Sequence, residues 1–188
     1  MNSSPEHSNR LVVFVGMPGS GKSAAVHYLS KKGWQVVHFG AITINEIKKR
    51  GITVNEANER EVREELRKTH GMAAYAKLSL ARIKHALSVG PTVIDGLYSW
   101  SEYKFLKQQL PSRMYVIAIS APRHIRYVRL SHRRTRPLSC KEAEVRDFAE
   151  IENLEKGGPI AIADYTVQNS GTKRELFSAL DRLFSTLF

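Results

Sequence analysis

The chain has 188 residues, of which 42% are hydrophobic and 25% are charged, proportions that favour one globular domain with its own core. The single cysteine, Cys140, excludes an internal disulfide and a cysteine-based zinc site, and no apolar run is long enough to cross a membrane. The 29 Lys and Arg residues outnumber the 18 Asp and Glu residues and give a net charge of +11, which favours anionic partners such as nucleotides, nucleic acid or acidic lipid.

The first nine residues are polar and lack the basic-then-apolar order of a signal peptide. We therefore expect residues 1–9 to form a disordered tail, and we expect a cytoplasmic protein. Residues 10–188 contain no repeat, linker or low-complexity segment, so they are expected to form a single domain.

Short apolar segments alternate with helical patterns through the rest of the chain. Strands are expected at 10–16, 34–40, 91–96, 114–120 and 165–169. Helices are expected at 20–32, across 41–89 with breaks near Gly51 and Gly71, and after capping boxes at Ser99, Ser139 and Thr172, the second of these helices being closed by Gly157 and Gly158. This order favours an α/β fold, a three-layer sandwich around a five-stranded parallel sheet that binds its ligands at the carboxyl ends of the strands.

The stretch "GMPGSGKS" between the first strand and the first helix matches the phosphate-binding pattern G-x-x-x-x-G-K-[ST]. Its glycines let backbone N–H groups converge on phosphates at the start of a helix. Lys22 can reach the β- and γ-phosphates, and Ser23 offers a hydroxyl to Mg²⁺. The motif predicts a nucleoside triphosphate and Mg²⁺ as cofactors, held by Gly16, Met17, Pro18, Gly19, Ser20, Gly21, Lys22, Ser23 and Ala24.

A carboxylate follows the third apolar strand, at the end of "TVID". Phosphate-binding loops of this type commonly use an acidic residue on a neighbouring strand to arrange Mg²⁺ and its waters. Asp95 is therefore expected to be a metal residue together with Ser23, although an aspartate in this place can also be an ordinary turn residue.

Six arginines crowd the stretch "RHIRYVRLSHRRTR" after the fourth strand: Arg123, Arg126, Arg129, Arg133, Arg134 and Arg136. On a continuous helix, four of them (Arg126, Arg129, Arg133 and Arg134) would share one broad face. Guanidinium groups stabilise the charge that develops in phosphoryl transfer, whereas a solvated basic face is the alternative. Because only four acidic residues follow up to position 150 (Glu142, Glu144, Asp147 and Glu150), and all of them lie beyond the run, we expect an unneutralised cluster that meets an anion.

Together these motifs resemble a P-loop kinase of the nucleoside monophosphate kinase group, closest to the adenylate-kinase-related or dephospho-CoA-kinase-like proteins. The resemblance extends over residues 11–188 and is carried by "GMPGSGKS", "IDG", "RLSHRR" and "IADYTVQNSGTKREL". It implies ATP- and Mg²⁺-dependent transfer of the γ-phosphoryl group to a small nucleotide-like acceptor. It also implies a helical acceptor-binding insert at about 41–89 and a lid at about 131–142.

The resemblance also assigns roles to particular residues. Lys22, Arg129, Arg133 and Arg146 match catalytic positions: Arg129 is the base-stacking arginine, Arg133 the phosphate-binding arginine of the lid, and Arg146 the arginine after the lid. The loop "QNSGT", with Ser170, Gly171 and Thr172, matches the segment whose backbone contacts the adenine.

On the acceptor side the sequence departs from this family. Ile44, and Ser99 or Trp100, stand where arginines commonly bind the acceptor phosphate. The remaining candidates for acceptor contacts are Arg63, Arg67, Lys77 and Tyr98. Arg63 and Arg67 fit equally well as members of i,i+4 ion pairs on a helix.

Three other functions stay open at this stage. A dephospho-CoA kinase would use a hydroxyl acceptor and a carboxylate base. A regulatory ATPase would bind the nucleotide without a small-molecule acceptor. A nucleic-acid-binding protein would explain the charge, but the sequence contains no recognition module, so neither nucleic acid nor a membrane is expected as a partner.

Overall fold

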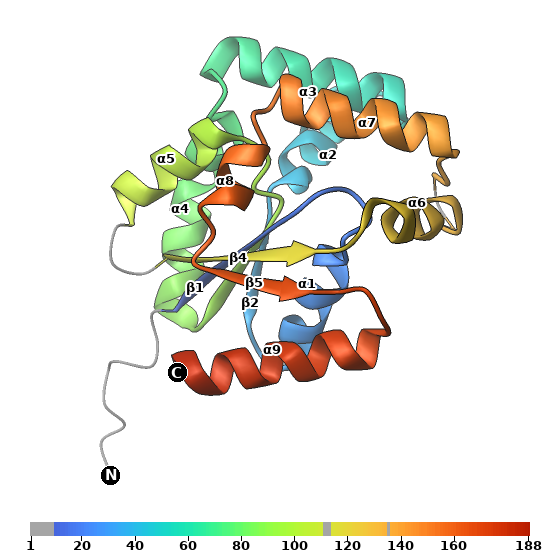
Figure 1. Ribbon diagram of the computed structural model, residues 1–188. Coiled ribbons are helices and arrows are strands. Elements are labelled where there is room, and N and C mark those ends of the chain that lie inside the picture. The colour runs from blue at the N-terminus through green and yellow to red at the C-terminus, as the bar shows by residue number, and fades with distance from the viewer. Residues whose placement is uncertain (1–9, 111–113, 135) are drawn as a thin grey trace.

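The structure is a computed structural model that describes residues 10–110, 114–134 and 136–188, so the expected tail at 1–9 lies outside the described residues. The described chain forms a five-stranded parallel sheet in the order β2-β3-β1-β4-β5 (Figure 1). Its strands are β1 (Leu11–Val15), β2 (Gln35–His38), β3 (Thr92–Asp95), β4 (Met114–Ser120) and β5 (Tyr165–Gln168). Helices cover both faces of the sheet, which confirms the expected three-layer α/β sandwich.

The helices follow the expected alternation with the strands. They are α1 (Lys22–Lys31), α2 (Gly40–Lys49), α3 (Glu56–His70), α4 (Ala74–Val89), α5 (Trp100–Gln109), α6 (Arg123–Ser131), α7 (Cys140–Glu152), α8 (Gly157–Ala161) and α9 (Lys173–Leu187). The capping boxes expected at Ser99, Ser139 and Thr172 are confirmed, each with both reciprocal hydrogen bonds.

One helix end differs from the sequence expectation. The helix that begins after Ser139 ends at Glu152, and Gly157 starts α8 instead of closing α7. The chain turns at Glu155, whose φ of 51° lies in the left-handed region. This turn directs the next residue, Lys156, into the interior, and helix-period reasoning has no means of detecting it.

The side chains of β1 alternate between two hydrophobic cores. Val13 and Val15 face a core completed by α4 and α5, whereas Val12 and Phe14 face a core completed by α1 and α9. A strand that is buried on both faces is typical of the centre of a parallel sheet. The central position of β1 places the loop that follows it in the middle of the sheet's carboxyl edge.

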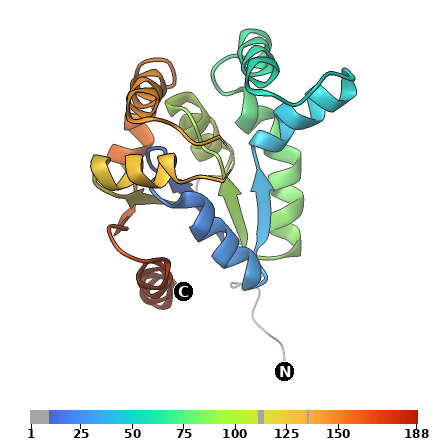
Figure 2. The ribbon, with the colours of Figure 1, turned by 90° about the vertical axis from the view of Figure 1, so that its right-hand side faces the viewer.

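Two helical arms extend beyond that carboxyl edge. One arm contains α2 and α3 and follows β2; the other contains α6 and α7 and follows β4 (Figure 2). In Figure 2, α3 and α7 lie on opposite sides of the upper part of the molecule, α7 on the left and α3 on the right. The two arms therefore flank the place where parallel α/β sheets bind ligands.

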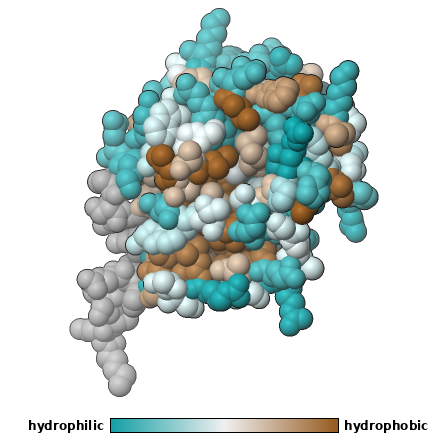
Figure 3. Space-filling model, viewed as in Figure 1, coloured by the Kyte–Doolittle hydropathy of each residue, from teal (hydrophilic) through white to brown (hydrophobic). Residues whose placement is uncertain are grey.

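The outer surface is mixed in hydropathy. In the face shown in Figure 3, hydrophilic side chains predominate, and apolar ones gather between the edge strand β5 and α9. Within the described ranges, no helix combines the length and the apolar character that a membrane span requires.

Candidate nucleotide and acceptor site

The loop between β1 and α1 has the conformation that its glycines permit. Gly16 and Gly19 have φ angles of 142° and 78°, in the region that disfavours other residues. A Cβ atom would lie 2.3 Å from the carbonyl oxygen of Ile119 at Gly16, and 2.6 Å from that of Arg126 at Gly19. Packing as well as φ therefore demands glycine at these two positions.

Lys22 begins α1 and bends back into this loop. Its Nζ atom donates hydrogen bonds to the carbonyl oxygens of Gly16 at 2.7 Å and Met17 at 3.1 Å. Burial, and then the charge of Lys156, lower the pKa of Lys22 to about 7, although the nearby carboxylates of Glu150 and Asp95 act in the opposite direction. An incoming anion would relieve this repulsion, so the position suits a phosphate group.

Polar contacts to other elements hold the loop in its conformation. Arg126 donates to the carbonyl oxygen of Pro18 at 2.9 Å and forms a two-pronged buried ion pair with Asp147 at 2.9 and 2.6 Å. The side chain of Asn169 donates to the carbonyl oxygen of Ser20 at 2.7 Å. The loop conformation is thus supported by α6, α7 and the end of β5.

The arginine segment does not form the single unneutralised face that its spacing suggested. Because α6 ends at Ser131, Arg133 and Arg134 do not continue the helical face of Arg126 and Arg129. Three arginines already have carboxylate partners: Arg126 pairs with Asp147, Arg123 with Glu144, and Arg136 with Glu56 and Glu59. These acidic residues come from separate parts of the chain, so the charge balance within the segment was misleading.

Arg129 holds the loop that was expected to contact the adenine. Its guanidinium donates to the carbonyl oxygens of Asn169 and Gly171, each at 2.9 Å. Thr172 caps α9, and the hydroxyl of Ser170 is 3.2 Å from the Gln168 amide nitrogen. Arg129 thus joins α6 to this loop, and its stacking on a base stays a prediction.

Four cationic side chains interact electrostatically with Glu150: Lys22, Arg133, Arg146 and Lys156. Glu150 accepts a hydrogen bond from Arg146 at 3.3 Å and a short one from Lys156. Burial, followed by the charge of Arg146, lowers the pKa of Arg133. The structure therefore brings the catalytic candidates Lys22, Arg133 and Arg146 into one electrostatic group.

Lys156 and Glu150 were missed by the sequence reasoning. Neither belongs to a motif, and a lysine after a helix end ordinarily points into solvent. A buried lysine becomes apparent only when the turn between α7 and α8 is known.

The two expected metal residues lie at the edges of this group. Ser23 is exposed at the first turn of α1, and Asp95 ends β3 beside Phe14 of β1. Their oxygens are the hard ligands that Mg²⁺ prefers, with the rest of the shell coming from phosphates and water. Within the described ranges, no three His, Cys, Asp or Glu side chains are grouped to hold a metal alone. The residues fit a metal that arrives with its nucleotide.

A cavity of about 380 Å³ opens next to Asp95, at the carboxyl ends of β2 and β3. Its lining residues are His38, Gly40, Ala41, Ile44, Asn45, Asp95 and Tyr98. The Nδ1 atom of His38 lies 3.1 Å from Asp95, an arrangement that the sequence reasoning did not detect. Of the four candidates for acceptor contacts, Tyr98 lines this cavity.

The other three candidates for acceptor contacts lie on α3 and α4. Arg63 pairs with Glu56 and Glu59, as the i,i+4 alternative allowed. Arg67 lies over the ring of Tyr75 at 5.3 Å, and Lys77 donates to the carbonyl oxygen of His70 at 2.9 Å. A role for them in acceptor binding stays a prediction.

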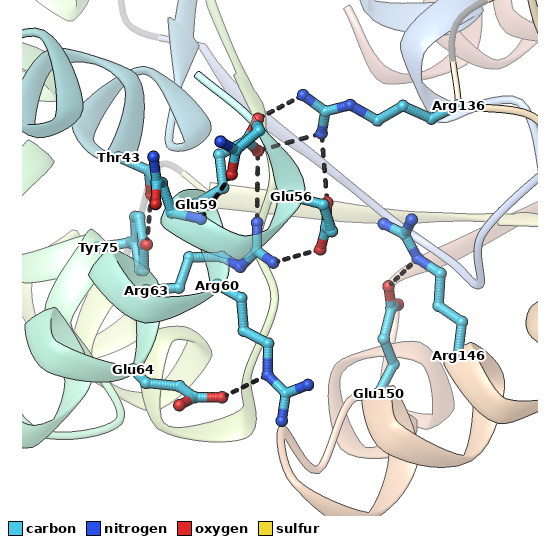
Figure 4. A network of polar contacts seen from close by, with 12 residues as sticks. Thr43, Glu56, Glu59, Arg60, Arg63, Glu64, Tyr75, Arg136, Arg146 and Glu150 are labelled. Atoms are coloured by element: carbon cyan, nitrogen blue, oxygen red, sulfur yellow. Dashed lines mark hydrogen bonds and ion pairs between the residues drawn. The ribbon is translucent and has the colours of Figure 1, made fainter. Parts of the chain in front are cut away.

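A polar network joins the two arms. Arg136, within the segment expected to form the lid, reaches the carboxylates of Glu56 and Glu59 on α3, and Arg63 shares both (Figure 4). The side chain of Glu59 is only 10% exposed. Residues 77 to 80 positions apart thus connect the expected lid to the expected acceptor insert.

Comparison with known proteins agrees with this geometry. A family model described as an AAA domain matches residues 12–150. The "UPF0200 protein" of Thermococcus gammatolerans is 34% identical over 169 residues, which cover 88% of each chain. Most of the chain is therefore related in sequence to proteins of this kind.

Solved structures share the fold at much lower identity. TT1252 from Thermus thermophilus has a TM-score of 0.67 at 19% identity, covering 97% of this chain and 99% of that one. Shikimate kinase from Bacteroides thetaiotaomicron has a TM-score of 0.59 at 13% identity, covering 95% and 98%. The fold is that of P-loop kinases, which confirms the broad resemblance, while the nucleoside monophosphate kinase subgroup is not shown. The chain belongs to the UPF0200 family and contains its P-loop domain of the AAA type.

Proposed function

We propose that this protein is a small-molecule kinase that transfers the γ-phosphoryl group of ATP to an acceptor bound in the cavity at the ends of β2 and β3. One observation carries the proposal. Asp95 lines that cavity and is also close enough to Lys22 for its charge to act on the lysine's pKa. The nucleotide loop and the cavity therefore share a carboxylate at their boundary, as a transfer between neighbouring sites requires.

Each part of the chain has a defined task in this reaction. The backbone N–H groups of the loop and Lys22 bind the β- and γ-phosphates, and Arg133 and Arg146 stabilise charge on the group in transfer. Ser23 and Asp95 would hold Mg²⁺, which supplies charge neutralisation on the phosphate oxygens when it is bound. Closure of the arms over the cavity excludes water that would otherwise compete with the acceptor.

We further propose a nucleotide-like acceptor, as in nucleoside monophosphate kinases. Arg133, Arg146 and Lys156, which are grouped around Glu150, would also attract an acceptor that carries a phosphate of its own. The rings of His38 and Tyr98 at the cavity offer flat surfaces for a base or sugar.

The test is ADP release measured with a panel of acceptors: nucleoside monophosphates, deoxynucleotides, dephospho-CoA and shikimate. We expect at least one phosphate-bearing acceptor to raise ADP release above the rate with ATP alone, and the product to carry the transferred phosphoryl group. Asp95→Asn should then raise the Mg²⁺ concentration that gives half of the maximal rate by about 10-fold or more. Unchanged magnesium titration in that variant would make Asp95 structural.

A regulatory ATPase without an acceptor is the second candidate. It is favoured by Arg63 and Lys77, which contact groups on α3 and do not line the cavity. This function predicts slow ATP hydrolysis that no member of the acceptor panel changes.

A further inference from the structure

The turn between α7 and α8 carries a lysine in an unusual position. Lys156 is 2% exposed, although lysine is among the residues that are least often buried. The preceding residue, Glu155, adopts a φ of 51°, which is uncommon for a residue with a side chain and costs backbone energy. The burial of this ammonium group and the left-handed conformation before it are both energetically unfavourable.

The turn is held firmly in place. A Cβ atom at Gly158 would lie 2.9 Å from the ring of Trp100, so the backbone packs directly against that ring. The backbone N–H of Trp100 points to the carbonyl oxygen of Leu154 at 3.4 Å. Lys156 is therefore presented by a packed turn and not by a free loop.

Lys156 interacts with a residue of the phosphate loop and with a residue of the acceptor cavity. The charge of Lys156 is the largest electrostatic influence on the phosphate-loop lysine, Lys22. Its Nζ atom is also 5.5 Å from the centre of the Tyr98 ring, and Tyr98 lines the acceptor cavity. Lys156 therefore acts electrostatically on the loop lysine and lies beside a residue of the cavity.

The charges around it leave room for an anion. Glu150 pairs with both Lys156 and Arg146, and Arg133 and Lys22 add two further cations. Glu150 and Asp95 are the carboxylates that act on Lys22 in return, so the cations outnumber them. An ammonium group has three donors, and the hydrogen bond to Glu150 occupies one of them.

We propose that Lys156 is a further phosphate-binding residue of this protein, which contacts the terminal phosphoryl group of the nucleotide at the boundary with the acceptor cavity. This inference rests on the proposed function. Glu150 is then a positioning residue that keeps Lys156 and Arg146 directed at the same phosphoryl group. A purely structural ion pair between Lys156 and Glu150 is the competing explanation.

The test compares binding of a non-hydrolysable ATP analogue with binding of ADP, by calorimetry in magnesium buffer on the full chain. Lys156→Met should weaken binding of the triphosphate analogue roughly 10- to 100-fold, the value of a hydrogen bond to a charged group, and change ADP binding less than about 3-fold. Lys156→Arg should restore most of the difference. Lys32→Met, which breaks the surface pair with Asp181, is the matched control and should change neither.

If Lys156→Met does not fold because Glu150 is left unpaired, the double variant Lys156→Met, Glu150→Gln removes both charges and should show the same selective loss. Equal losses for the analogue and ADP, or no loss for either, would overturn the inference. Selective loss in a protein that phosphorylates no acceptor would support the role of Lys156 and count against the proposed kinase function. The reverse result, acceptor phosphorylation with no selective loss, would reject Lys156 and leave the kinase function standing.

Discussion

On the donor side of the site, eight consecutive residues form the phosphate loop, and α6, α7 and the end of β5 support it through hydrogen bonds. On the acceptor side, the cavity is assembled from the end of β2, the start of α2, the end of β3 and the loop before α5. The first arrangement depends on local backbone geometry, whereas the second depends on how separate elements meet. A contiguous motif therefore predicts the donor chemistry, and the acceptor has to be inferred from tertiary contacts.

The largest effect is expected from the donor side. Lys22→Ala should lower ATP turnover about 1000-fold or more, because it removes the ammonium group that we propose contacts the β- and γ-phosphates. Steady-state kinetics measures the loss. Lys31→Ala, at the exposed end of the same helix, serves as the control, and turnover that is equally insensitive to both changes would refute the assignment of the loop.

A smaller effect should separate catalysis from binding. Arg133→Ala is expected to lower kcat about 100-fold and to change the Kd for ATP by no more than a few-fold, because its contact strengthens in the transition state. The neighbouring Arg134, which is also exposed, provides the comparison variant Arg134→Ala. Losses in kcat and ATP affinity of the same size would remove Arg133 from the catalytic group.

The network between the two arms should have a moderate effect on the acceptor alone. Arg136→Ala removes the ion pairs that join the expected lid to Glu56 and Glu59 on α3. We expect the KM for the acceptor to rise about 3- to 10-fold, because closure of the arms loses a partly buried ion pair. Arg60→Ala breaks the exposed pair with Glu64 on the same helix and should leave the KM within 2-fold; an equal rise in both variants would argue against a connection between the arms.

The smallest effect concerns Glu102, whose carboxyl group accepts hydrogen bonds from the backbone N–H groups of Tyr98 and Ser99. Burial raises the pKa of Glu102 to about 7, so the folded state keeps a proton that the unfolded chain releases near its ordinary value of 4.5. The stability from this proton is complete below about pH 4.5 and is lost as the pH rises through 7. The Tm of the wild type should fall by a few degrees between pH 5 and pH 8.

Glu102→Gln should remove that part of the pH dependence, because a glutamine does not titrate in this range. The control is Glu175→Gln, which alters the same capping-box position in α9 where the side chain is exposed. A pH profile of Tm that is identical in the wild type and Glu102→Gln would show that Glu102 does not titrate in this window.

Much of the fold follows from local patterns. The five strands were expected within two residues of their observed ends, because each is a short apolar run closed by glycine, a polar residue or a turn. The capping boxes at Ser99, Ser139 and Thr172 were predictable because both partners of each lie within four residues. The end of α7 was not predictable, because the turn after it depends on Glu155, and glutamate does not favour the left-handed conformation that Glu155 adopts.

The charged residues behaved differently from the backbone. The arginine run suggested one anion-binding face, but Asp147, Glu144, Glu59 and Glu56 neutralise half of its members from other elements. Arg126 instead supports the phosphate loop through its hydrogen bond to Pro18, and the charge of Arg133 acts on Lys22. Electrostatic partners are chosen by proximity in space, which linear spacing describes only along a single helix.

By itself, the amino-acid sequence determined the phosphate loop, the order of strands and helices, and hence a P-loop α/β fold. These depend on glycine conformations, side-chain period and capping, all of which act over a few neighbouring residues. The tertiary structure alone decided that His38 meets Asp95, that Arg136 joins the two arms, and that Lys156 lies buried against Glu150 and Tyr98. Those contacts join residues from separate elements, because burial and charge pairing are properties of the packed chain.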